Sequence, residues 1–480
     1  MLFNSYIFIL VFFPIVFAGY YLLLNLKNKS IAKIFFVLAN LYFYSYWNVH
    51  YLPIMLASIA INFTLATILN KINRLRLKRT VLTIGILFNI ALLGYYKYYD
   101  FFMTNVNTVF GTNIGLLNLA LPLAISFFTF QQIMYLVDTF REGTKEYSLL
   151  DYAFFVTFFP HLIAGPIVHH REIINQLRDG SNYKIKSNNI ASGLYIFSVG
   201  LFKKVIIADT LAGWANQGYN NIASLSMFDS WITTFAYTFQ LYFDFSGYCD
   251  MAIGLALFFN INLPVNFNSP YKALDIQDFW RRWHMTLGRF FTNYLYIPLG
   301  GNRKGTARTY FNLFFIFFVS GIWHGAGWTF VIWGILHGIA SVICRFWKGL
   351  NIKLPKFIAW FITFFFVHIA WVFFRSPDLT TAKVLLTKML NLQTFQFPAG
   401  IASTFNELIG THFYPATYYF DLKLSLVLVF ILGIILFAKN SIERLNTYKP
   451  SYRLAAFISI IAVISFLYLN RVSEFLYFKF

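Results

Sequence analysis

The stretch FIAWFITFFFVHIAWVFF, residues 357–374, decides the fold class, because His368 is the one ionisable side chain in an otherwise apolar run. A bilayer crossing requires roughly 20 predominantly apolar helical residues. Comparable runs recur along the chain, so the sequence predicts an all-α polytopic membrane protein with about 11 to 14 transmembrane or re-entrant segments. The other runs are Tyr6–Leu24, Ile34–Tyr46, Leu52–Leu69, Val81–Tyr95, Leu121–Val137, Ile190–Leu201, Trp231–Phe243, Phe311–Ile322, Trp328–Ile343, Leu424–Phe437 and Leu454–Leu469.

The composition agrees with a membrane protein. Of 480 residues, 58% are hydrophobic and 12% are charged, which is about half the charged fraction of a soluble domain. The net charge of +20 is concentrated in short loops between apolar runs, so nucleic-acid binding is not expected. Cys249 and Cys344 lie in apolar surroundings and predict no disulfide or metal site. The histidines and carboxylates form no spaced ligand set, so no metal is expected.

Lysine and arginine residues in the loops predict the orientation. Basic loops at 27–33 and 71–79 are expected in the cytoplasm, which places the N-terminus outside. The basic loop at 439–453 precedes the last apolar run and places the C-terminus outside as well. The first run lacks a basic flank and an A-x-A-like cleavage site, so we expect it to remain as an uncleaved helix.

The chain is expected to form a single integral membrane domain, 1–480, because no linker or repeat divides it. Within it we expect N-terminal transmembrane helices at 1–110 and a catalytic core at 115–350. A polar insertion at 376–421, partly helical around Thr381–Leu390, is expected outside the membrane. The last helix and an aromatic tail occupy 454–480.

The run Ser320-Gly-Ile-Trp-His-Gly-Ala-Gly-Trp-Thr-Phe330 surrounds His324 with three glycines and two tryptophans, Trp323 among them. Glycine allows bends and close backbone approach to a ligand, and non-helical backbone at membrane depth is tolerated where it lines a cavity. His324 is therefore a candidate general base for an acceptor hydroxyl. His337 is either a second catalytic group or a packing histidine. His368, alone on an aromatic helix, is expected to hydrogen-bond a neighbouring helix.

The second candidate site is Asp275-Ile-Gln-Asp-Phe-Trp-Arg-Arg-Trp-His-Met-Thr-Leu-Gly-Arg289. Asp275 is a typical helix N-cap, and the aromatic residues after it have helical spacing. One interpretation is an amphipathic helix at the membrane interface. The other is a cytoplasmic mouth whose arginines hold the phosphates of an acyl donor such as coenzyme A. The candidate donor-binding residues are Arg281, Arg282, Trp283, His284 and Arg289.

A third motif, Gln240-Leu-Tyr-Phe-Asp-Phe-Ser-Gly-Tyr-Cys-Asp250, sets two acids in apolar sequence. Asp244 is a candidate for orienting a histidine or a substrate hydroxyl, and Asp250 is a second supporting acid. The alternative is a structural ion pair with Arg281 or Arg282, because acids in membranes are usually paired.

These motifs together resemble the bacterial membrane-bound O-acyltransferase family, of the alginate and peptidoglycan O-acetyltransferase type. The similarity is carried, in order, by LPLAISFFTFQ at 121–131, FFPHLIAGPIVHHRE at 158–172, GLFKKVIIADTLA at 200–212, FDFSGYCDMAIGLAL at 243–257, NFNSPYKALDIQDFWRRWHMTLGRFFTNYLYIPLGGNRKG at 266–305 and GIWHGAGWTFVIWGILHG at 321–338.

The resemblance implies a ring of helices around a tunnel through the bacterial inner membrane. It assigns the catalytic histidine to His324 and the second family histidine to His337, and it puts residues 281–284 on the cytoplasmic side of the tunnel. Acetyl-CoA is implied as the donor substrate, with no bound cofactor. A polysaccharide acceptor and a periplasmic or surface partner resembling an SGNH hydrolase are also implied. The ending FLYFKF resembles the aromatic motif of teichoic acid D-alanylation, which would make Tyr477 an acyl relay. The alternative interpretation is that this aromatic ending is an anchor at the membrane interface.

Two other functions compete with acetyl transfer. D-alanyl transfer to teichoic acid would require a dedicated carrier protein. A non-enzymatic polysaccharide transporter would contact membrane lipids and polymer in the same way, but it would not need His324.

Overall fold

The computed structural model describes residues 1–143, 147–392, 422–470 and 476, and every regular element in these ranges is a helix. Five helical segments are long and apolar enough to cross a membrane, which confirms the polytopic class. They are Val49–Lys71, Leu75–Phe110, Ser187–Asn220, Trp328–Gly349 and Lys356–Arg375. Shorter apolar helices are Phe8–Leu24, Ser30–Ser45, Lys423–Phe437 and Tyr452–Leu467. The total number of crossings stays a prediction.

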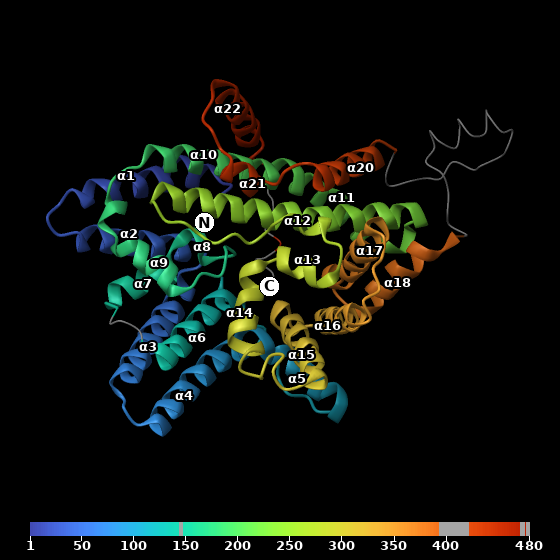
Figure 1. Ribbon diagram of the computed structural model, residues 1–480, viewed down its shortest axis with the longest axis horizontal. Coiled ribbons are helices and arrows are strands. Elements are labelled where there is room, and N and C mark those ends of the chain that lie inside the picture. The colour runs from blue at the N-terminus through green and yellow to red at the C-terminus, as the bar shows by residue number, and fades with distance from the viewer. Residues whose placement is uncertain (144–146, 393–421, 471–475, 477–480) are drawn as a thin grey trace.

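The N-terminal helices form one side of the molecule (Figure 1). Helix α1 packs on α2, α2 on α7, and α4 on α6. Their bounds are α1 Phe13–Leu24, α2 Ser30–Ser45, α3 Leu52–Lys71, α4 Leu75–Leu93, α5 Tyr99–Phe110, α6 Ile125–Glu142, α7 Leu149–Thr157, α8 Phe159–Leu162 and α9 His170–Arg178. π-Helical turns at Phe8–Phe12 and Gly94–Tyr98 precede α1 and α5.

Helix α12 (Met227–Phe258) is the central element, and it lies along α10 (Ser187–Phe202) and α11 (Asp209–Asn220) in Figure 1. It begins with a capping box, in which the Ser226 hydroxyl accepts from the Asp229 N–H and the Asp229 carboxylate accepts from the Ser226 N–H. Such boxes satisfy two N–H groups that a helix start leaves unpaired. The helix also continues to Phe258, well beyond the expected apolar segment Trp231–Phe243.

The remaining helices are α13 Ile276–Arg282, α14 Met285–Phe291, α15 Thr306–His324, α16 Trp328–Gly349, α17 Lys356–Arg375, α18 Leu379–Leu390, α20 Leu422–Phe437, α21 Ser441–Asn446 and α22 Tyr452–Leu467. Of these, α17, α18 and α20 pack on α12, α21 and α22 pack on α10, and α15 packs on α16. Helix α18 covers the helical part expected near Thr381–Leu390. The rest of the expected polar insertion, 393–421, lies outside the described residues, as does most of the tail after 470.

Glycines bring α10 and α12 into backbone contact. A Cβ atom at Gly200 would lie 2.6 Å from the Gly247 carbonyl oxygen, and one at Gly254 would lie 2.7 Å from that of Gly193. Helices in membranes associate through such small residues, because apolar side chains gain little by leaving lipid. The two helices are therefore held at a distance that larger residues would not allow.

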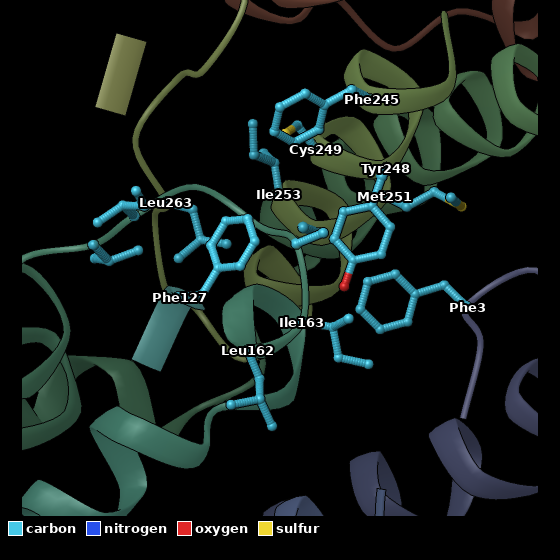
Figure 2. Close-up of a cluster of buried hydrophobic side chains, with 14 of the residues drawn as sticks. Phe3, Phe127, Leu162, Ile163, Phe245, Tyr248, Cys249, Met251, Ile253 and Leu263 are labelled. Atoms are coloured by element: carbon cyan, nitrogen blue, oxygen red, sulfur yellow. The ribbon is translucent and has the colours of Figure 1, made fainter. Parts of the chain in front are cut away.

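The core between α12, α8 and the N-terminal segment is aromatic. Figure 2 shows Phe3 facing Tyr248 of α12, with Ile163 beside them. The rings of Phe3 and Tyr248 are stacked with centroids 4.8 Å apart. Aromatic pairs of this kind add about 0.5–1.5 kcal/mol beyond their buried area, and they fix the first residues of the chain against the central helix.

Candidate active site

His324 is the last residue of α15, and Gly325 and Gly327 have extended backbones on either side of a bend at Ala326 before α16 begins at Trp328. Glycine is required here for space, because a Cβ at Gly325 would lie 2.2 Å from the Phe330 ring. A Cβ at Gly321 would lie 2.4 Å from the Phe330 carbonyl oxygen. The glycines therefore close the α15–α16 hairpin tightly and place His324 at its tip, rather than leaving all three free to approach a ligand.

Aromatic rings enclose the His324 imidazole, which is 2% exposed. The ring of His324 lies 4.9 Å from that of Trp323, 5.1 Å from that of Trp333 and 5.2 Å from that of Phe374, all between centroids. A site walled in this way excludes water, which strengthens every electrostatic interaction inside it.

Several buried polar atoms around His324 have no hydrogen-bond partner among the residues that the structure describes. They are His324 Nδ1, His337 Nε2, Trp323 Nε1, Trp333 Nε1 and Ser341 Oγ. Buried polar groups are normally paired, and each exception needs an explanation. These five all belong to the α15–α16 hairpin, where they are available to hydrogen-bond a polar substrate.

His337 lies beside this cluster with its ring 4.7 Å from Trp333. The Trp280 indole N–H donates to His337 Nδ1 over 3.2 Å. Because Nδ1 accepts, the hydrogen of the neutral ring is on Nε2, which makes that atom a donor. His337 is therefore suited to hold a substrate oxygen, and His324 is the better candidate base.

Lys97 and Tyr98 contact the end of α15, and sequence reasoning missed both. Lys97 Nζ donates to the Trp323 carbonyl over 2.6 Å and to the Ser126 hydroxyl over 3.1 Å. The Tyr98 hydroxyl donates to the Ile322 carbonyl over 3.0 Å. The last carbonyls of a helix lack intrahelical partners, so these two side chains complete the helix end that carries His324.

A cavity of about 500 Å³ lies beside the α15–α16 hairpin, and neither His324 nor His337 is among its lining residues. Ser320 and Ser341 line it, one helical turn from His324 and His337 respectively. Its other walls carry positive charge. The cationic lining residues are Arg281, Arg289 and Arg345.

The segment 276–291 is two short helices, so the single amphipathic helix suggested by its spacing is wrong. His284 adopts a left-handed conformation with φ of 45° and separates α13 from α14. The Asn266 side-chain oxygen lies 3.1 Å from His284 Nδ1 and accepts from the Thr286 N–H over 3.2 Å. These tertiary hydrogen bonds override the local pattern. The expected N-cap is confirmed, because the Asp275 carboxylate accepts from the Asp278 N–H over 2.8 Å.

The expected donor-binding residues fall into two groups. Arg281 and Arg289 line the cavity, whereas Arg282 is bound to Asp278 over 3.0 Å and does not. Trp283 packs on Trp371 with ring centroids 5.0 Å apart. His284 is buried, with its ring 6.3 Å from that of Trp323. Trp283 and His284 thus support the walls of the site from behind.

Arg289 is fixed by a second contact away from the cavity. Glu172 accepts from both terminal nitrogens of Arg289, over 2.6 and 3.0 Å. Burial raises the pKa of Glu172, but Arg289 and the His169 N–H lower it by more, so that the net pKa is below its ordinary value. The carboxylate stays charged at neutral pH and orients the guanidinium.

Asp138, His169 and His170 lie close enough together to hold a metal ion by distance alone. His169 Nε2 is 2.7 Å from an Asp138 oxygen, and Tyr294 donates to the same carboxylate over 2.8 Å. The His169 side chain also accepts from the N3 backbone N–H of α9. The hydrogen of a neutral His169 ring is then on Nε2, pointing at Asp138. His170 Nε2 lies 3.3 Å from the same carboxylate, so the expectation that no histidines and carboxylates form a ligand set missed this cluster.

Asp244 and Asp250 pair with lysines, so the expected pairing with Arg281 or Arg282 is wrong. Asp244 lies 2.7 Å from Lys204, and Asp250 lies 2.6 Å from Lys203. Both lysines come from the π-helical turn Lys203–Ala208 between α10 and α11. The lysines and the aspartates are far apart in the sequence, so no local pattern predicts that they pair.

His368 and Tyr477 complete the set of expected residues. Thr234 and Thr238 lie 3.2 and 2.9 Å from the two ring nitrogens of His368, which confirms its role in helix packing. Tyr477 lies outside the described residues. The N–H of its neighbour Leu476 donates to Asp244 over 3.4 Å.

The chain is similar to a known protein family and to individual members of it. Residues 1–376 match the model of the membrane-bound O-acyltransferase family. The chain is 50% identical over 422 residues to a peptidoglycan O-acetyltransferase of Helicobacter pylori, which covers 82% of this chain and 80% of that protein. It is 37% identical over 405 residues to a probable alginate O-acetylase of Pseudomonas aeruginosa, covering 82% and 76%. A teichoic acid D-alanyltransferase of Bacillus subtilis is 26% identical over 278 residues, covering 54% and 70%. The chain therefore belongs to the membrane-bound O-acyltransferase family and is an O-acyltransferase.

Proposed function

We propose that the protein passes an acetyl group from cytoplasmic acetyl-CoA across the inner membrane for O-acetylation of an extracytoplasmic polysaccharide. Peptidoglycan is the favoured acceptor, because the relative of that name is 50% identical, against 37% for the alginate O-acetylase. Alginate and other envelope glycans share the same hydroxyl chemistry. A periplasmic or surface partner of the SGNH-hydrolase type would complete the transfer.

The observation that carries this proposal is the group of buried polar atoms without partners among the described residues on the α15–α16 hairpin, which shares Ser341 with a cavity lined by three arginines. Arginines suit the phosphates of coenzyme A, and a thioester bound at Ser320 and Ser341 would lie about one helical turn from each histidine. The basic loops on either side of the candidate spans support a cytoplasmic donor side and extracytoplasmic termini.

The reaction needs a base for the hydroxyl proton and a hydrogen-bond donor for the negative charge that develops on the carbonyl oxygen. His324 takes the proton of the acceptor hydroxyl as the oxygen attacks the thioester carbonyl carbon. The carbon–sulfur bond then breaks, and the thiolate of coenzyme A takes the proton from the imidazolium. His337, with its hydrogen on Nε2, holds an oxygen of the reacting groups. Tyr477 is proposed as the hydroxyl that first receives the acyl group.

The test is ester-linked acetate on isolated envelope fractions from cells with wild-type protein or His324→Ala, at matched membrane levels. The exposed-site variant His50→Ala is the control. We expect acetate to disappear from one polymer with His324→Ala alone, which also identifies the acceptor. If every fraction keeps its acetate, the proposal is wrong. D-alanyl ester lost in its place would assign the protein to the teichoic acid reaction.

A further inference from the structure

Lys97 occupies an unusual place for a lysine. It lies in the π-helical turn Gly94–Tyr98, inside the candidate membrane-spanning segment Leu75–Phe110. π-Helical turns interrupt α-helices frequently at functional sites. The turn directs Lys97 towards the tip of the α15–α16 hairpin, where its Nζ contacts the backbone of Trp323 and His324.

The charge of Lys97 has no counter-ion in the described part of the chain. Its oxygen partners are the Trp323 carbonyl at 2.6 Å, the Ser126 hydroxyl at 3.1 Å and the His324 carbonyl at 3.4 Å. Lys203 and Lys204, by contrast, each lie within 2.7 Å of an aspartate. A charge at membrane depth is costly and is usually paired or functional, so an unpaired lysine beside a candidate base needs a reason.

The helix end supplies part of that reason. Carbonyls in the last turn of a helix carry partial negative charge, and a cation there is favourable by roughly 0.3–1 kcal/mol, or about 2 kcal/mol when partly buried. That gain is smaller than the several kcal/mol that burying an ion costs. Helix capping alone therefore does not explain why a lysine, rather than a neutral donor, stands at this position.

We propose that Lys97 supplies the positive charge that stabilises the tetrahedral oxyanion of acyl transfer at His324. The inference rests on the proposed function. An ammonium group has three N–H donors, and two of them have short contacts to Trp323 and Ser126. The third has only the 3.4 Å contact to the His324 carbonyl, so it is the donor that an incoming oxyanion would take.

The step balances without any further reactant. Attack by the acceptor oxygen moves the carbonyl π electrons onto the carbonyl oxygen, and Lys97 stabilises that charge without giving up its proton. Collapse returns the electrons, breaks the carbon–sulfur bond and releases the thiolate. Donors arranged in advance for such an oxyanion typically contribute 10²- to 10³-fold in kcat each.

The test compares Lys97→Gln, which keeps amide N–H donors but removes the charge, with Lys97→Arg, which keeps the charge. Lys71→Gln, an exposed lysine at the end of α3, is the matched control. The full-length protein in membrane vesicles is assayed by thiol release from acetyl-CoA. We expect Lys97→Gln to lower kcat by about 10²- to 10³-fold with little change in KM, and Lys97→Arg to recover at least tenfold of that loss.

The pH profile separates charge from structure. The titratable groups that face His324 from packed elements are Lys97, His284 and His337. Removing the positive charge of Lys97 removes its repulsion of protonated His324. The acidic limb of kcat/KM therefore moves to higher pH in Lys97→Gln and stays in place in Lys97→Arg. An unmoved limb, or a kcat within a few-fold of wild type, overturns the inference. If His324→Ala is inactive while Lys97→Gln is active, only the proposed role of Lys97 is wrong. If both variants are active, the proposed function itself is wrong.

Discussion

Replacing Lys204 with methionine should destabilise the protein severely. Lys204 Nζ lies 2.7 Å from Asp209 and 2.7 Å from Asp244, and the side chains of Lys204 and Asp244 are 1% and 2% exposed. Methionine fills a similar volume but carries no charge, so both carboxylates lose this cation. Because removing one partner of a buried pair costs about 3–5 kcal/mol, the folding equilibrium should fall by about two to four orders of magnitude.

The assay is unfolding of the purified full-length chain in detergent micelles, with Lys71→Met as the exposed control. A triple variant, Lys204→Met with Asp209→Asn and Asp244→Asn, also removes both carboxylate charges and should regain at least half of the lost free energy. Replacing a whole buried ion network by neutral residues often changes the stability of the protein little. A loss below about 1 kcal/mol in the single variant, or a triple variant as unstable as the single one, would refute this reasoning.

Three further outcomes can be measured. Tyr477→Phe removes the proposed relay hydroxyl and should abolish polymer acetylation at unchanged membrane levels; normal acetylation rules the relay out. Arg281→Gln removes one proposed phosphate contact and should raise KM for acetyl-CoA about 10- to 100-fold, since a charged hydrogen bond contributes about 1.5–3 kcal/mol. An unchanged KM would contradict donor binding at Arg281. Burial raises the pKa of Asp151, but Lys33 and Arg178 lower it by more, to below 3.8. Its stabilising effect is therefore complete above about pH 4 and is lost as the pH falls through the lower folded value. The melting temperature of wild type should fall more steeply than that of Asp151→Asn below pH 4, and parallel curves would contradict this.

Hydrophobic runs predicted the membrane helices well. The run at 357–374 is α17 almost residue for residue, since a lipid environment leaves few alternatives to a continuous helix. Asp275 was predicted correctly as an N-cap, because capping depends on the residue type next to the helix start, which the sequence contains. The break at His284 could not be predicted, because it depends on hydrogen bonds from Asn266, eighteen positions away.

The candidate site shows the same division. His324 stood out because glycines and tryptophans surround it in the sequence. Lys97 did not, because the apolar run was expected to end at Tyr95, and only the π-helical turn carries the helix on to Phe110. A lone lysine in a long aromatic and apolar segment was the available signal. The partners of Asp244 and Asp250 depend on the register between α10 and α12, which no local pattern contains.

The glycine contacts between α10 and α12 also have a mechanical meaning. Where two helices touch through peptide atoms, no rotamer change can widen the gap, and the pair moves as one stiff body. The α15–α16 hairpin is locked in the same way by Gly321 and Gly334, whose backbones approach each other directly. Any motion that admits a bulky donor or releases a product must then occur outside these stiff pairs, where side chains that can rotate, such as Trp280 against Trp333 and His337, form the contacts.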